Sequence, residues 1–209
     1  MLSMAAQGLK KVLLGEGPEE GEALDTALLA KVLAALGPGG IGCGPGPGGG
    51  CARIKARDRA DFSGVWRRYR DQNFVELLTF CGVSRAAAAK ARDAPSTHLI
   101  EMDNWHDYFH IVVQKGNRRV EDHYVIGHDT PNRDASGGAL YESWVRWEAE
   151  EQALVVTSTS KQLGVELVSV RTMQASGDVM VLSQLARRRD RPGTTVAARM
   201  CFRRSRGPE

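Results

Sequence analysis

The stretch FSGVWRRYRDQNFVELLTFCGVS, from Phe62 to Ser84, joins two kinds of pattern within a few residues. Its first part lies within the segment Ala60–Tyr69, whose residues are typical of a β-strand. Asn73–Phe80 and Ser84–Arg92 have helical character, and Cys81-Gly82-Val83 separates them. We therefore expect one strand followed at once by a helical hairpin.

The chain beyond this hairpin consists of short alternating segments separated by turn residues such as Gly116-Asn117 and Ser176-Gly177-Asp178. A meander of about ten strands leaves two exposed edges unless it closes, so we expect a mainly β protein, a closed antiparallel up-and-down barrel with a helix-turn-helix lid. Such a barrel encloses room for one small ligand. The further strands are expected at Thr97–Asp103, Tyr108–Gln114, Arg118–Ile126, Ala139–Glu148, Ala153–Ser160, Val165–Met173, Val179–Ala186 and Thr194–Arg204, with a brief additional strand near His128.

The region before the barrel has a different composition. GPGGIGCGPGPGGG, from Gly37 to Gly50, offers almost no side chain to bury and is predicted to be a linker. Upstream, Glu22–Leu36 carries apolar residues at four-residue spacing, which predicts one amphipathic helix that docks on the barrel, on a partner, or on nothing stable. The expected division is an N-terminal extension at 1–36, a linker at 37–59, a barrel at 60–204 and a tail at 205–209.

Composition limits the classes of function. A net charge of +3 over 209 residues gives no strong field for nucleic acid, and no run of about 18 apolar residues or secretion signal is present. The four cysteines do not resemble a disulfide framework, and Cys43 with Cys51 falls short of a zinc site. His106 and His110 lie too far apart along a strand to share a metal. We expect a cytoplasmic protein without cofactor, metal or nucleic-acid partner.

The opening stretch resembles a known family. Phe62-x-Gly64-x-Trp66, then Asn73-Phe74, then Gly82-Val83 between two short helices is similar to the start of the cytosolic fatty-acid-binding and retinoid-binding proteins, the intracellular lipid-binding proteins of the calycin superfamily. The C-terminal segment GTTVAARMCFRR, from Gly193, resembles the last strand of that family. Independently of the family, we expect Trp66 in the core, and we expect Gly64 at a place where a neighbouring group of the protein approaches the backbone closely.

The resemblance implies a ligand carboxylate held inside the barrel by two arginines and a tyrosine. By position these arginines are Arg171 and Arg199, while Cys201 occupies the place of the tyrosine. Arg199 and Cys201 share a strand face, and an anionic ligand would offset the cost of a buried guanidinium. The alternative is that these arginines face outward or pair with an internal acid such as Asp122. The other positions expected at the ligand are Phe74, Leu78, Phe109, Ile111, Tyr124 and Tyr141.

The sequence thus predicts a non-enzymatic carrier of a hydrophobic molecule, a fatty acid or similar lipid carboxylate. The basic run Arg187–Arg191 is interpreted either as a solvated loop or as a transient contact with an anionic membrane surface. Two rival hypotheses stay open. One is a luciferase-like enzyme on the same barrel, and the other is an interaction module without a cavity that uses the N-terminal helix or the basic loop.

Overall fold

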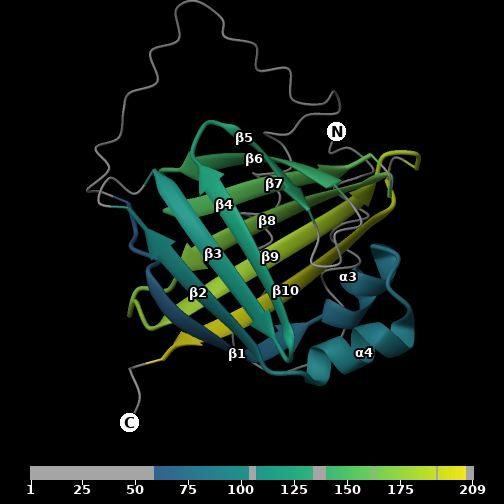
Figure 1. Ribbon diagram of the computed structural model, residues 1–209, viewed down its shortest axis with the longest axis horizontal. Helices are drawn as coiled ribbons and strands as arrows, with labels where there is room; N and C mark the ends of the chain where they lie inside the picture. The colour runs from purple at the N-terminus through teal and green to yellow at the C-terminus, as the bar shows by residue number, and fades with distance from the viewer. Residues whose placement is uncertain (1–58, 104–106, 134–139, 162, 192, 206–209) are drawn as a thin grey trace, which may run out of the picture.

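The computed structural model of the chain describes residues 59–103, 107–133, 140–161, 163–191 and 193–205 (Figure 1). The helix predicted at 22–36 and the linker that follows it lie outside these residues. None of the described helices is long and apolar enough to cross a membrane.

The described chain forms one ten-stranded antiparallel sheet with two helices after its first strand. Every strand pairs with its neighbour in sequence except β4 with β5, and the first strand also pairs with the last. The elements are β1 (Gly64–Gln72), α3 (Phe74–Phe80), α4 (Arg85–Asp93), β2 (Ser96–Met102), β3 (Tyr108–Lys115), β4 (Arg118–Val125), β5 (Asp129–Arg133), β6 (Leu140–Glu148), β7 (Ala153–Ser160), β8 (Val165–Met173), β9 (Val179–Arg188) and β10 (Thr195–Arg204). The predicted meander and its inserted helical hairpin are therefore confirmed.

The barrel is nearly closed, which corrects the prediction of full closure. The sheet runs in the order β4-β3-β2-β1-β10-β9-β8-β7-β6-β5, so β4 and β5 are its two edges. β5 has only five residues and includes Pro131, which has no backbone N–H to give to a ladder. The Gly127 N–H instead donates to the Val145 carbonyl on β6, 2.8 Å away. A short proline-containing strand thus leaves the seam open.

The first strand begins later than expected and continues longer, from Gly64 to Gln72. Asn73 follows in the left-handed conformation (φ 58°), and α3 starts at the next residue. Ser84 caps α4, because its hydroxyl accepts a hydrogen bond from the Ala87 N–H at 3.3 Å. The two helices cover one end of the barrel, where α3 packs against β9 and β10 (Figure 1).

The interior of the barrel is a cluster of apolar side chains that point inward from all parts of the sheet. Trp66 is fully buried, as predicted, and its indole N–H donates to the Phe62 carbonyl at 2.8 Å. The cluster consists of Phe62, Trp66, Phe74, Ile100, Phe109, Ile111, Tyr124, Val145, Leu154, Val156, Met180, Leu182, Met200 and Phe202. Since cross-strand partners share a face, this cluster identifies the inner face of every strand that contributes to it.

The pairing of β1 with β10 depends on a close approach at Gly64. A Cβ at this position would lie 3.0 Å from Arg204 Nη1, and the backbone has φ +130°. The Arg204 guanidinium lies over the Trp66 ring at 4.4 Å and donates to the carbonyls of Gly177 (3.3 Å) and Asp61 (3.2 Å). The predicted close approach at Gly64 is therefore confirmed, and the Arg204 guanidinium occupies the space that glycine leaves.

We predict that Gly64→Ala lowers the free energy of unfolding by roughly 2–3 kcal/mol, because it combines a disfavoured backbone angle with a clash. Gly177→Ala is the matched control, since Gly177 has φ +71° and no atom lies within 4 Å of the place that an added methyl group would take. It should cost about 1 kcal/mol. Equal losses for the two variants in urea titrations would show that the Arg204 contact contributes nothing.

Candidate functional site

A buried arginine lies at the centre of the inner face. Arg171 on β8 pairs across the sheet with Leu154 and Leu182, both members of the inner cluster. Its side chain is buried, and its Nε makes no hydrogen bond. A buried donor without a partner in an apolar interior is unusual, and it marks the place where an acceptor from outside the chain would be stabilised.

Asp122 and Tyr124 on β4 interact with Arg171 across the interior. The Tyr124 hydroxyl and the Asp122 carboxylate are hydrogen-bonded, and both act electrostatically on Arg171. Burial raises the pKa of Asp122, while the Arg171 charge opposes that rise. Burial also raises the pKa of Tyr124, and the neighbouring Asp122 adds to this effect. Asp122 therefore acts on Arg171 through its charge, and a direct ion pair between the two stays a prediction.

His98 on β2 is the second polar group of this site. Its ring lies 4.3 Å from the Phe202 ring, and its Nδ1 is buried without a hydrogen-bond partner. Burial lowers the pKa of His98 to about 3, helped by the positive charges of Arg171, Lys115 and Arg68. His98 is therefore neutral at physiological pH and has one nitrogen available as a donor or acceptor.

Two further cations lie nearer the lid. Lys115 Nζ lies 4.0 Å from the centre of the Phe74 ring, and the Arg68 guanidinium lies 5.0 Å from the same ring. Burial lowers the pKa of Lys115 to about 8, and the Arg68 charge contributes to this lowering. These cation–π contacts attach α3, which carries Phe74, to β1 and β3.

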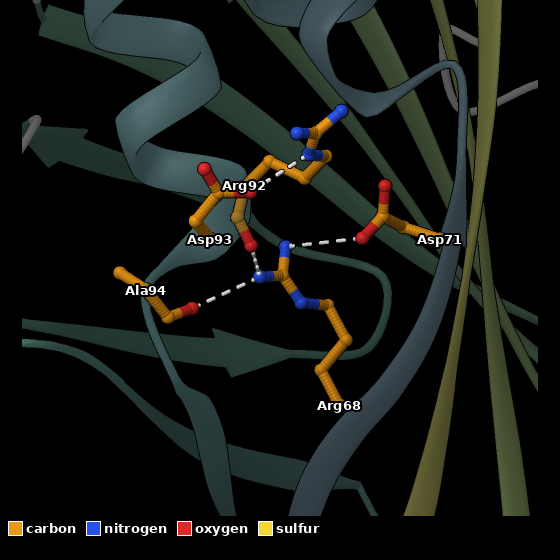
Figure 2. Close-up of polar contacts among 5 residues, drawn as sticks. All are labelled: Arg68, Asp71, Arg92, Asp93 and Ala94. Atoms are coloured by element: carbon orange, nitrogen blue, oxygen red, sulfur yellow. Dashed lines mark hydrogen bonds and ion pairs between the residues drawn. The ribbon is translucent and has the colours of Figure 1, made fainter.

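Arg68 also holds the second helix in place. Figure 2 shows its side chain reaching from β1 to the C-terminal end of α4, where Nη2 donates to the carbonyls of Arg92 and, at 2.9 Å, Ala94. Nη1 lies 3.8 Å from an Asp71 oxygen. A cation at a helix C-terminus satisfies carbonyls that have no partner in the helix. Sequence reasoning missed Arg68, although it stands two residues after Trp66 and so on the same strand face.

The apolar positions predicted to face the interior do so. Phe109, Ile111 and Tyr124 are buried members of the inner cluster, and Phe74 joins them from α3. Leu78 packs against the cluster from the same helix and is partly buried. Tyr141 shares the inner face of β6 with Ser143 and Val145, because the three alternate along the strand.

Arg199 and Cys201 lie on the other face of β10, contrary to the assumption that their face lines the interior. Their cross-strand partners on β9 are Ser183 and Val181, whereas the inner cluster contains Met200 and Phe202. A shift of one residue in a strand moves every side chain to the opposite face. The inner positions of the last strand thus carry methionine and phenylalanine, and Arg171 has no second arginine from β10 beside it.

Metal-binding side chains come together on the outer surface instead. His110 on β3 pairs directly with His123 on β4, and their ligand atoms and those of Glu121 lie within 4.8 Å of one another. Glu101 accepts a hydrogen bond from His110 Nδ1 at 2.9 Å if that nitrogen carries the proton. The two imidazole rings are stacked with an interplanar angle of 3°, so their in-plane lone pairs do not converge. A metal ion would need one ring to rotate.

No family model matches the chain, but individual proteins are similar to it. Human cellular retinoic acid-binding protein 2 is 26% identical over 121 residues, which cover 58% of this chain and 87% of the relative. The Schistosoma mansoni fatty acid binding protein in complex with arachidonic acid has a TM-score of 0.56 at 20% identity, over 69% of this chain and 96% of that one. The REP1-NXSQ fatty acid transporter has a TM-score of 0.59 at 15% identity, over 71% and 99%.

We predict that His98 makes stability fall with acidification. Its pKa is about 3 in the folded chain and about 6.5 in the unfolded one, so the unfolded state binds the proton more tightly. The contribution is fully present above pH 6.5 and is lost as the pH falls towards 3. Between pH 7 and pH 5 the loss should be on the order of 2 kcal/mol. Urea unfolding at both pH values should show this loss reduced in His98→Gln and retained in the exposed-surface control His128→Gln; equal losses in both would contradict it.

Proposed function

We propose that the chain is a member of the intracellular lipid-binding protein family and a non-enzymatic cytoplasmic carrier that binds one lipophilic carboxylate inside its barrel. The observation that carries the proposal is the buried Arg171, whose Nε has no hydrogen-bond partner. A guanidinium in an apolar interior is costly unless an anion or acceptor pairs with it. A ligand carboxylate supplies both, and the planar fork of arginine matches it.

The charged side chains inside the barrel and under its lid favour a ligand with an anionic head group. Arg68, Lys115 and Arg171 all act on His98. The acids that act on these cations are Asp71, Asp122 and Asp93, and Asp93 is itself paired with Arg92 at the end of α4. Cations therefore outnumber acids in this group. An additional negative charge is stabilised there more than it would be in water, because the surroundings are apolar.

The apolar part of the ligand would contact the inner cluster. Phe109 and Ile111 are fully buried, and Phe74 and Leu78 present apolar surface from the lid. Burying a hydrocarbon chain contributes about 25 cal/mol per Å² of apolar surface, so the chain supplies most of the affinity and the head group fixes its orientation. Retinoic acid and arachidonic acid, which appear in the names of the relatives, each combine an apolar chain with one carboxyl group.

The proposed entrance lies beside the helical lid. Phe74 of α3 sits against Arg68 and Lys115, and Arg68 also binds the end of α4 (Figure 2). A ligand that passes under the lid meets these two cations before it reaches Arg171. The basic run at Arg187–Arg191 covers the end of β9 and the start of the turn to β10. Its exposed members Arg189 and Arg191 would favour a transient contact with an anionic membrane during transfer.

One observation favours a second candidate, the interaction module without a cavity. Large side chains such as Trp66, Phe62, Phe109 and Phe202 occupy the inner face and are fully buried. If they leave too little room for a lipid chain, the barrel acts as a scaffold and its surfaces carry the function. Failure to retain any lipid would distinguish this candidate from the carrier.

We predict that Arg171→Gln weakens binding of a long-chain fatty acid by at least tenfold, which corresponds to about 1.4 kcal/mol. Binding of the alcohol with the same chain should change by less than threefold, because it has no charge to lose. Arg199→Gln is the matched control, since its side chain lies on the other face of the barrel. Displacement of a fluorescent fatty acid gives all three affinities. A loss in the control as large as that in Arg171→Gln would place the head group elsewhere.

We also predict that Asp122→Asn tightens fatty-acid binding several-fold. Asp122 is the internal anion that acts on Arg171, so it competes with the ligand carboxylate for the same cation. The substitution keeps the size of the side chain and removes the charge. Calorimetric titration with the fatty acid and with its alcohol checks this, and unchanged or weaker binding of the acid would show that Asp122 is not a competitor.

A further inference from the structure

The outer face of strands β7 to β10 is apolar over a wide area. One row of cross-strand partners consists of Val155, Val170, Ser183 and Arg199, and the next consists of Thr157, Val168, Leu185 and Ala197. All of these lie on the face opposite to Leu154, Arg171, Leu182 and Met200. They therefore point away from the barrel interior.

These outward side chains are nevertheless buried. The relative exposure is 0% for Val155 and 1% for Val168, Val170, Leu185 and Ala197. Within an uncovered sheet, neighbouring strands shield the flanks of a valine but leave its outer end accessible to solvent. Burial this complete requires a second layer over the face.

The described part of the chain does not supply that layer. Its helices, α3 and α4, sit at one end of the barrel (Figure 1). No described helix or strand packs over the outer sides of β7 and β8. The layer must come from the residues outside the described ranges.

The opposite wall of the barrel shows that an apolar outer face is not general here. Glu101, His110 and His123 form a cross-strand row on the outer face of β2, β3 and β4. Glu101 and His123 are exposed. The sequence thus places polar groups on one wall and valine, leucine and alanine on the other, which is how a chain specifies a site for a second layer.

Only the N-terminal part is long enough to form the layer. Four adjacent strands span about 14 Å between the outer two axes. The gaps at 104–106, 134–139, 162 and 192 are short and fixed at both ends, and 206–209 comprises four residues. A helix of 15 residues is about 22 Å long and would cross all four strands.

The segment 22–36 has the matching chemistry. Leu24, Leu28, Val32 and Leu36 recur every four residues, with Leu29 and Leu33 beside them. On a helix they form one broad apolar face. A helix of this length is not stable alone in water, and an apolar sheet face provides what it lacks. Residues 37–58 can extend over some tens of ångströms, so the linker permits the docking.

We propose that residues 22–36 form a helix that docks its leucine-rich face on the outer face of β7 to β10. The helix makes a second layer against the barrel wall and leaves the lid at α3 and α4 uncovered. This inference does not depend on which ligand the barrel binds. Cys201 lies on the same outer face and is 6% exposed, so it reports whether the face is covered.

The test uses the full chain with Cys43→Ser, Cys51→Ser and Cys81→Ala, so that Cys201 is the remaining thiol. Val32→Asp puts a charge into the apolar face of the segment, and we expect it to speed the reaction of Cys201 with a thiol reagent at least tenfold. Ala34→Asp is the matched control, because two residues along a helix turn the side chain by about 200°. It should leave the rate within twofold of the parent. A fast reaction already in the parent, or equal rates in the two variants, would overturn the proposal.

Hydrogen exchange and molecular mass complete the test. Amides of 22–36 should exchange slowly in the parent and in Ala34→Asp, and fast in Val32→Asp. Amides of the barrel strands should stay protected in all three, which shows that Val32→Asp has undocked the helix without unfolding the barrel. A protected Cys201 in a particle of twice the chain mass, with residues 22–36 unprotected, would mean that a second copy covers the face and would refute the proposal.

Discussion

The pairing of the first strand with the last is the constraint on which this structure depends. β1 pairs with β10 along most of its length, and this pairing turns the meander of strands into a nearly closed barrel. Gly64 allows the pairing, because a side chain there would meet Arg204. With these strands joined, the inner side chains of the whole sheet face one another, and Tyr124 and Asp122 on β4 act electrostatically on Arg171 on β8. The polar centre of the interior is therefore a consequence of closure.

Closure of the barrel also buries polar side chains, which affects the stability of the fold and the ligand binding that we propose. Arg171, Asp122 and His98 are groups that an apolar core of this size does not need, and each is disfavoured by burial. The Asp122 charge offsets part of the cost of burying Arg171. Under the proposed function, an anionic ligand would compete with Asp122 for Arg171. Hydrocarbon contacts with the apolar side chains of the interior would then supply most of the affinity.

Much of the fold can be predicted from the sequence, because turn residues and helix boundaries are local signals. Gly116-Asn117 and the hairpin after β1 are recognisable from a few neighbouring residues. The last strand cannot be oriented in this way. Ala197, Ala198, Met200 and Cys201 make both of its faces apolar or small, so alternation does not tell which one lines the interior. That is why the prediction of an interior Arg199 is wrong. Arg68 could have been placed on the inner face from its spacing to Trp66, but its bonds to the end of α4 depend on tertiary structure that the local pattern does not contain.

The central claim is that the barrel takes up one lipophilic carboxylate. Native mass spectrometry of the full chain tests it most directly, after the protein has been stripped of lipid and offered a fatty acid, retinoic acid and a tetrapyrrole in separate samples. We expect one molecule of fatty acid or retinoic acid to be retained per chain. A chain that retains no ligand of any class while its barrel remains folded would contradict the claim and favour the interaction module.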